Sequence, residues 1–152
     1  MRVSAKTDYA IRAVLELASA DDERPVKGER IATAQGIPLR FLENILMQLR
    51  HAGLVESRRG ADGGYRLARA PDEVTLADVI RAIDGPLAAV SGTRPESLDF
   101  EGVAEPMRDV WIAVRASLRS VLEQITLADI TAGELPSHVR TLLADDEAWL
   151  PH

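Results

Sequence analysis

Residues 38–67 read PLRFLENILMQLRHAGLVESRRGADGGYRL and predict one helix followed by one hairpin. Pro38 suits the first turn of a helix, where its missing N–H group costs nothing. Gly53 is a residue type that commonly follows the end of a helix. Between them, apolar residues recur at the spacing of a buried helix face: Leu39, Leu42, Leu46 and Leu49.

The hairpin is predicted from two short runs, residues 54–58 and 65–69, which flank a glycine-rich turn. Upstream, Ser4 can cap a first helix, and a short second helix spans about residues 27–34. The turn Gln35-Gly36-Ile37 separates the second helix from the third. This order of elements is that of a winged helix-turn-helix. We therefore predict a mainly α-helical fold with a small β-hairpin.

A long amphipathic helix is predicted further downstream. Thr75 opens a helix that Gly85-Pro86 ends, and residues 87–104 show no periodicity. The next helix begins at Glu105-Pro106 and runs to about residue 125. Its apolar residues alternate at spacings of three and four: Met107, Trp111, Val114, Leu118, Val121 and Ile125. A chain this small has little of its own to cover such a stripe, so we interpret it as a homodimer seam; an ordinary core helix is the alternative.

The sequence divides into three parts. We assign residues 1–85 to a winged helix-turn-helix DNA-binding domain, residues 86–104 to an effector or linker loop, and residues 105–152 to a dimerisation helix and C-terminal helices. Charge is also uneven: residues 1–70 carry 12 Lys+Arg and 9 Asp+Glu, whereas residues 71–152 carry 6 and 15. The basic half is a candidate for contact with a polyanion, and an uneven scatter of surface charge is the alternative.

Composition excludes several classes of protein. The 152 residues are 46% apolar and 28% charged, as is usual for one globular domain. The absence of cysteine excludes disulfides, thiolate nucleophiles and cysteine-held zinc or iron–sulfur sites. No apolar run is long enough for a membrane span, and the N-terminus lacks a signal-peptide core, so we expect a cytoplasmic protein. We expect no catalytic residue, no metal site and no cofactor.

The outer face of the third helix carries residue types that read base edges. Arginine pairs with guanine, asparagine or glutamine with adenine, and glutamate accepts from the cytosine amino group. In a helix-turn-helix, the second helix of the pair enters the major groove of double-stranded DNA. We expect DNA contacts from Pro38, Leu39, Arg40, Phe41, Glu43, Asn44, Gln48, Arg50, Arg58, Arg59 and Arg66. The alternative, a solvated polar face, leaves an exposed Phe41 and an arginine-rich hairpin unexplained.

Short motifs spread over about residues 1–133 include Leu42-Glu43, Leu49-Arg50, Gly53-Leu54-Val55, Arg59-Gly60, Gly63-Gly64-Tyr65 and Ile83-Asp84-Gly85. Together they closely resemble the Rrf-two (Rrf2) superfamily of bacterial transcription regulators. The resemblance implies homodimers on imperfect palindromes, a long helix at the dimer interface and a wing arginine in the minor groove. By position, that arginine is Arg59, and the base-reading residues are Arg40, Phe41 and Glu43.

The chain departs from that family's pattern in one region. Cluster-binding members carry three cysteines between the fourth helix and the long helix, where this sequence has residues such as Gly92, Glu105 and Arg108. None of these supplies a sulfur ligand for iron. The chain therefore resembles the cluster-free branch, of which the cysteine-metabolism repressor is the best-known type.

These observations predict a DNA-binding transcriptional regulator, acting as a repressor, that binds a palindromic operator as a homodimer. The resemblance extends this expectation to control of cysteine or sulfur metabolism, without an iron–sulfur cluster. The expected effector is a small molecule or a partner protein acting on residues 87–104. The alternative is a winged-helix adaptor that binds protein and does not read DNA. An enzyme fits least, because no nucleophile–base pair is found.

Overall fold

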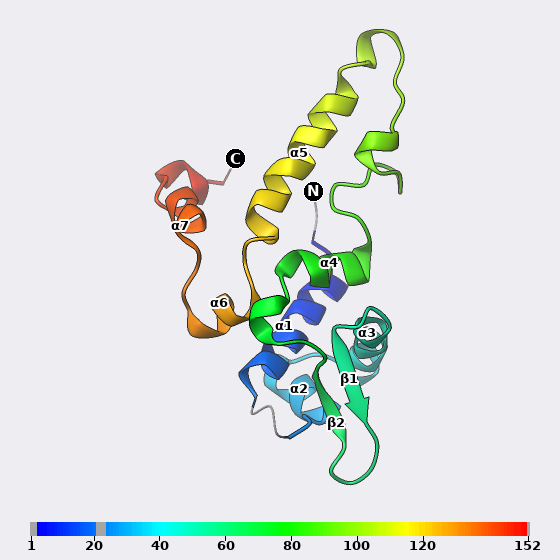
Figure 1. Ribbon diagram of the computed structural model, residues 1–152, viewed down its shortest axis with the longest axis vertical. Coiled ribbons are helices and arrows are strands. Elements are labelled where there is room, and N and C mark those ends of the chain that lie inside the picture. Colours follow the sequence, from blue (N-terminus) through cyan, green and yellow to red (C-terminus); the bar gives the residue numbers. More distant parts are fainter. Residues whose placement is uncertain (1–2, 21–23, 152) are drawn as a thin grey trace.

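Helices make up most of the fold, and one antiparallel hairpin lies between the third and fourth of them (Figure 1). The computed structural model describes residues 3–20 and 24–151; the first two residues, which belong to the N-terminus considered above, lie outside it. The α-helices and strands are α1 (Ala5–Ser19), α2 (Gly28–Gln35), α3 (Leu39–His51), β1 (Val55–Arg58), β2 (Gly64–Leu67), α4 (Leu76–Asp84), α5 (Met107–Leu122), α6 (Leu127–Ala132) and α7 (Ser137–Leu143). The predicted winged helix-turn-helix is confirmed.

Local side-chain caps fix where several helices begin. The Ser4 hydroxyl accepts a hydrogen bond from the backbone N–H of Thr7 at 3.1 Å and starts α1. Thr75 and Thr126 start α4 and α6 in the same way, each within a capping box closed by an aspartate three residues later. These bonds satisfy backbone groups that the first helical turn leaves unpaired.

The core lies between α1, α3 and α4, and α6 closes one side of it. On α3 the residues Leu42, Ile45, Leu46 and Leu49 are fully buried. Leu39, which the spacing placed on this face, is 36% exposed instead, as the first residue of α3 at the end of the buried face. Leu127 of α6 is fully buried in the same cluster, so part of the chain assigned to dimerisation completes the core of the DNA-binding domain.

The hairpin is held to the helical body by a third short extended segment. β1 and β2 pair antiparallel with Val55 opposite Leu67. Val26, just before α2, exchanges two backbone hydrogen bonds with Tyr65 of β2, both 2.7 Å long. A side chain at Gly64 would place its Cβ 2.5 Å from the Val26 carbonyl oxygen, so this close approach requires glycine.

α5 is shorter than its sequence pattern predicts. It begins at Met107 and ends at Leu122, because residues 125–127 leave the helix to pair with residues 74–76. The Ile125 carbonyl accepts from the backbone N–H of Leu76 at 3.0 Å, and the Ile125 side chain is only 6% exposed. Ile125, which the spacing placed at the end of the predicted dimer seam, therefore packs within its own chain.

The segment between α4 and α5 also has more structure than its sequence indicates. It contains two 3-10 turns, at Pro95–Ser97 and Gly102–Ala104, and it runs back along α5 (Figure 1). Glu96 forms an ion pair with Arg115 of α5. Periodicity could not reveal these contacts, because short turns and a packed extended segment have no repeating apolar spacing.

Candidate nucleic-acid interface

Most of the outer face of α3 is exposed. Arg40, Glu43 and Asn44 are exposed, and Gln48 is half-buried. The Gln48 side-chain amide donates to the Asn44 side-chain oxygen at 2.8 Å, which orders both amides on one face. Met47 adds an exposed apolar side chain between them, with 45% of its surface accessible. This face therefore presents both hydrogen-bonding and apolar groups.

Phe41 is exposed, as predicted, but one edge of its ring is anchored. The ring packs edge-on against Tyr9 of α1, with 5.7 Å between the centroids, and 43% of Phe41 remains accessible. The Arg12 guanidinium lies over the Tyr9 ring, 4.9 Å from its centroid, and donates to the backbone carbonyl of Gln35 at 2.7 Å. The contact with α1 holds Phe41 in place on the exposed side of α3, where a rigid apolar surface suits a thymine methyl group.

The hairpin, or wing, carries its free positive charge near the tip. Arg58 and Arg59 are exposed, and neither forms an ion pair with a carboxylate in the part of the chain that the structure describes. Arg66, two residue pairs further from the tip than Arg58, is bound instead to Glu56 on the facing strand, with nitrogen–oxygen distances of 3.0 and 2.9 Å. Arg66 is therefore partly neutralised, whereas the two tip arginines are available to a polyanion.

Two further contacts join the wing to the helices. Arg50, in the last turn of α3, donates to the Ser57 hydroxyl of β1 at 2.9 Å. Lys27, just before α2, donates to the carbonyl of Ala61 in the wing turn at 2.7 Å. Sequence reasoning did not single out Lys27, and nothing in its spacing indicates this contact, since its partner lies 34 residues away.

A hollow of about 180 Å³ lies between α3 and the wing. Glu43 of α3 lines it together with Lys27 and Arg58. Glu29 lines it as well, so this hollow carries both carboxylates and cations close to the wing turn. The predicted contact residues consequently fall on two adjoining surfaces: α3 from Pro38 to Arg50, and the wing from Arg58 to Arg66.

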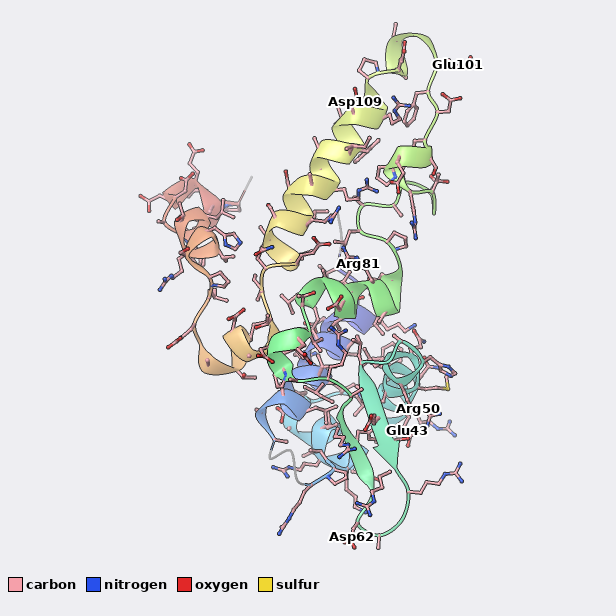
Figure 2. The ribbon with its side chains drawn as sticks, in the orientation of Figure 1. Glu43, Arg50, Asp62, Arg81, Glu101 and Asp109 are labelled. Atoms are coloured by element: carbon pink, nitrogen blue, oxygen red, sulfur yellow. The ribbon has the colours of Figure 1, made fainter. Side chains whose placement is uncertain are left out.

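Charged groups are separated along the molecule. Glu43, Arg50 and the wing-tip Asp62 lie at one end, whereas Glu101 and Asp109 lie at the far end beside the start of α5 (Figure 2). The wing and the start of α5 therefore lie at opposite ends of the molecule. Every helix in the described ranges is too short or too polar to cross a membrane.

The apolar stripe of α5 borders an open groove. The groove has a volume of about 830 Å³ and is lined mainly by apolar side chains, among them Leu87, Val114, Leu118 and Val121. Asp84 lies at its edge and accepts a hydrogen bond from the Thr7 hydroxyl at 2.5 Å. None of the sixteen residues of α5 is fully buried within the chain, and Met107 is 37% exposed. The stripe is thus only partly covered by the chain itself.

A helix pair with an exposed second helix, followed by a wing with unpaired arginines, defines the winged helix-turn-helix class of DNA-binding proteins. The family model for Rrf2, described as an iron-dependent transcriptional regulator, matches residues 3–133. The chain belongs to the Rrf2 family of transcriptional regulators.

Individual relatives agree with this assignment. A candidate HTH-type transcriptional regulator of Mycobacterium tuberculosis H37Rv is 52% identical over 146 residues, covering 96% of this chain and 90% of the relative. The HTH-type transcriptional regulator CymR of Bacillus subtilis is 37% identical over 132 residues, covering 87% and 91%. The chain is thus similar to DNA-binding transcriptional regulators over nearly its full length.

Two solved structures share the fold. CymR, titled the global cysteine regulator of B. subtilis, superposes with a TM-score of 0.73 at 36% identity, covering 88% of this chain and 98% of that one. IscR of T. potens superposes with a TM-score of 0.71 at 35% identity, covering 99% and 97%.

The residues of this chain do not fit an iron–sulfur cluster. Such clusters are held chiefly by cysteine thiolates, and the sequence has none. Within the described residues, no group of three or more His, Asp or Glu side chains is placed to hold a metal ion. Glu96, in the segment before α5, is already occupied by other partners. A backbone hydrogen bond and, next in importance, the contact with Arg115 lower the pKa of Glu96. The chain thus belongs with the cysteine-free members of the family.

Proposed function

We propose that the chain represses transcription as a homodimer bound to a palindromic operator. In each protomer α3 lies in a major groove, and the wing lies over the adjacent minor groove. The observation that supports this arrangement best is the exposed polar face of α3 beside a wing whose tip arginines, Arg58 and Arg59, have no acidic partner among the described residues. Two such helices read half-sites about 34–36 Å apart.

The contact residues divide by chemistry. Arg40, Asn44 and Gln48 read base edges, and Phe41 contacts a thymine methyl. Glu43 accepts from a cytosine amino group, because a carboxylate near phosphates is otherwise repelled. The remaining residues position the protein on the backbone or in the minor groove: Pro38, Leu39, Arg50, Arg58, Arg59 and Arg66.

The partner of the apolar α5 stripe is a second copy of the chain. The stripe borders a large groove and contains no fully buried residue, which leaves apolar surface for a partner. Two copies joined here match the two-fold symmetry of a palindrome. In this arrangement residues 86–104, which pack along α5, are the place where a small-molecule or protein effector alters the dimer.

The regulated genes are proposed to belong to cysteine or sulfur metabolism. This part of the proposal is supported by the similarity to CymR, whose structure is titled as that of a global cysteine regulator. Regulation then depends on an effector without an iron–sulfur cluster, because the chain lacks the thiolates to hold one.

The test is selection of duplex DNA from a randomised pool, followed by fluorescence anisotropy at two salt concentrations. We expect a palindromic site, and we expect Arg59→Ala to weaken its binding about tenfold and to lower the salt dependence by about one counterion. Arg140→Ala, which removes an exposed arginine on α7, is the matched control. Equal binding by both variants and the wild type contradicts the role of Arg59. Failure to enrich any duplex favours the protein-binding adaptor.

A further inference from the structure

Few contacts join α5 to the winged-helix body, which consists of α1 to α4 and the wing. α4 packs against α1 and α3 and so belongs to the body, whereas most of α5 extends away from it (Figure 1). At the joint, Thr75 and Thr126 face each other in a short antiparallel bridge, with backbone hydrogen bonds of 3.0 and 2.9 Å on either side. Each threonine also caps the helix that follows it. The backbone therefore fixes where α5 ends, but a single bridge leaves its tilt to side-chain contacts.

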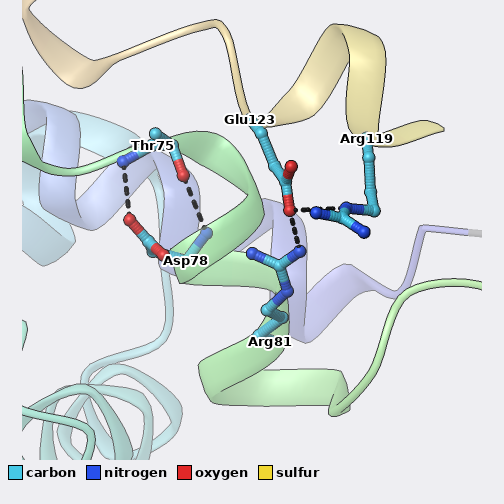
Figure 3. A network of polar contacts seen from close by, with 5 residues as sticks. All are labelled: Thr75, Asp78, Arg81, Arg119 and Glu123. Atoms are coloured by element: carbon cyan, nitrogen blue, oxygen red, sulfur yellow. Dashed lines mark hydrogen bonds and ion pairs between the residues drawn. The ribbon is translucent and has the colours of Figure 1, made fainter. Parts of the chain in front are cut away.

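One carboxylate connects the two elements across this joint. Glu123 follows the last residue of α5, and one of its oxygens accepts from both Arg81 of α4 and Arg119 of α5 (Figure 3). The Arg119 contact is 2.9 Å long and lies within α5. The Arg81 contact is the one that reaches the body. Both arginines lower the pKa of Glu123, with Arg81 contributing most, so its carboxylate is charged at neutral pH.

We propose that Glu123 is a positioning residue, whose contact with Arg81 sets the tilt of α5 against the winged-helix body and thereby the distance between the two wings of a dimer. The proposal rests on the homodimer proposed above. It concerns orientation rather than stability, because partly exposed ion pairs contribute little to the free energy of unfolding.

Geometry explains why a small contact matters for DNA binding. α5 has 16 residues and is about 24 Å long. A tilt of about 10° at its base moves its far end by about 4 Å, for a rod of that length. One base pair rises about 3.4 Å. The same rotation swings the body against α5, and a point of the body as far from the joint as α5 is long moves by about one base pair, which changes the distance between the wings.

The test measures the distance between the wings directly. The chain has no native cysteine, so Ala61→Cys in the exposed wing turn gives one nitroxide label per protomer. Double electron–electron resonance on the labelled full-length protein then reports the distribution of wing-to-wing distances. We expect a narrow distribution in the otherwise unchanged chain and a distribution at least twofold wider when Glu123→Gln or Arg81→Gln is added.

Two variants separate positioning from helix stability. Arg119→Gln removes the contact within α5 but keeps the one to α4, so it should leave the width nearly unchanged. Glu105→Gln removes the same charge at the other end of α5, away from the joint, and should also leave the width unchanged. Circular dichroism checks that all variants retain the helix content of the parent.

The outcomes distinguish this inference from the proposed homodimer. Loss of dipolar modulation in the labelled parent overturns the dimer and, with it, the role of Glu123. Normal modulation with equal widths in all variants overturns the role of Glu123 alone. An equal broadening by Arg119→Gln and Glu123→Gln also overturns it, because the effect then comes from the end of α5 rather than from its link to α4.

Discussion

Gly64 shows how a single residue fixes the position of the wing. Its φ of 150° and the Val26 carbonyl oxygen, 2.5 Å from where a Cβ would lie, leave no room for a side chain. This close approach permits the two hydrogen bonds between Val26 and Tyr65 that hold the wing to the body. The glycines of the hairpin are thus required for attachment as well as for the turn.

We expect Gly64→Ala to lower the free energy of unfolding by roughly 2–5 kcal/mol, because it adds backbone strain and a steric clash. Urea denaturation measures this loss. Gly36→Ala is the matched control: Gly36 also has a positive φ, of 62°, but open space surrounds its Cβ position. That variant should lose only about 1–2 kcal/mol. Equal losses for the two glycines would show that the contact with Val26 is unimportant.

Phe41 illustrates how one residue serves both the fold and the proposed site. Its exposure could be predicted from its place on the outer face of α3. Its contact with Tyr9 could not, because the two residues are 32 positions apart in the sequence and meet only when α3 packs on α1. A ring held on one edge loses little further side-chain freedom when DNA binds.

At the scale of elements, two copies of one short motif organise the joint. Thr-Leu-Ala-Asp occurs at residues 75–78 and at residues 126–129, and each copy forms a capping box. The two threonines pair with each other, so α4 and α6 start from a shared bridge. The two threonines that cap these helices locally therefore also form the tertiary contact between the starts of α4 and α6.

We expect Thr126→Ala to lower the free energy of unfolding by about 0.5–2 kcal/mol, the usual contribution of an N-cap. The Thr126 hydroxyl accepts from the Asp129 N–H at 3.1 Å, and this bond is lost. Chemical denaturation followed by circular dichroism measures the change. Thr33→Ala, at an exposed position within α2, removes a hydroxyl of the same kind and should have little effect.

The Glu123 cluster predicts a specific pH dependence. Its contacts with Arg81 and Arg119 lower the pKa of Glu123 below the ordinary value of 4.5. A carboxylate with a lowered folded-state pKa stabilises the fold above the unfolded-state pKa, and this contribution is lost as the pH falls through the folded-state pKa. The melting temperature of Glu123→Gln should therefore lie slightly below that of the wild type at pH 7, and this small difference should shrink as the pH falls below 4.5 and through the lowered folded-state pKa. A constant difference down to pH 3 would contradict this.

At the scale of the whole molecule, the two proposed surfaces lie at different ends. α3 and the wing form one end, while α5 and the segment that packs along it form the other (Figure 1). A change at α5 reaches the wings through the joint between α4 and α5. Dimer contacts and DNA contacts can accordingly be altered separately by mutation.

We expect Leu118→Glu to convert a dimer into monomers, because it places a charge in the apolar groove beside α5. Sedimentation velocity measures the change in mass. Val103→Glu introduces the same charge at a fully exposed position and should leave the dimer intact. A monomeric wild-type protein, or a dimeric Leu118→Glu variant, would contradict the assignment of the seam to α5.

The sequence alone determined the features that depend on local interactions. Caps at Ser4, Thr75 and Thr126, and the periodicity of α3, are set by residues within one or two turns of each other, so they could be read directly. The hairpin and the exposed polar face of α3 were predicted for the same reason. These elements suffice to define the winged helix-turn-helix.

The long-range partners of these elements became clear only from how the elements pack. Ile125 is withdrawn from the α5 stripe by pairing near Leu76, Lys27 reaches the wing turn, and Glu123 reaches Arg81. Each of these contacts joins residues separated by more than 30 positions. Such pairings depend on how whole elements pack, and neither periodicity nor capping signals carry that information.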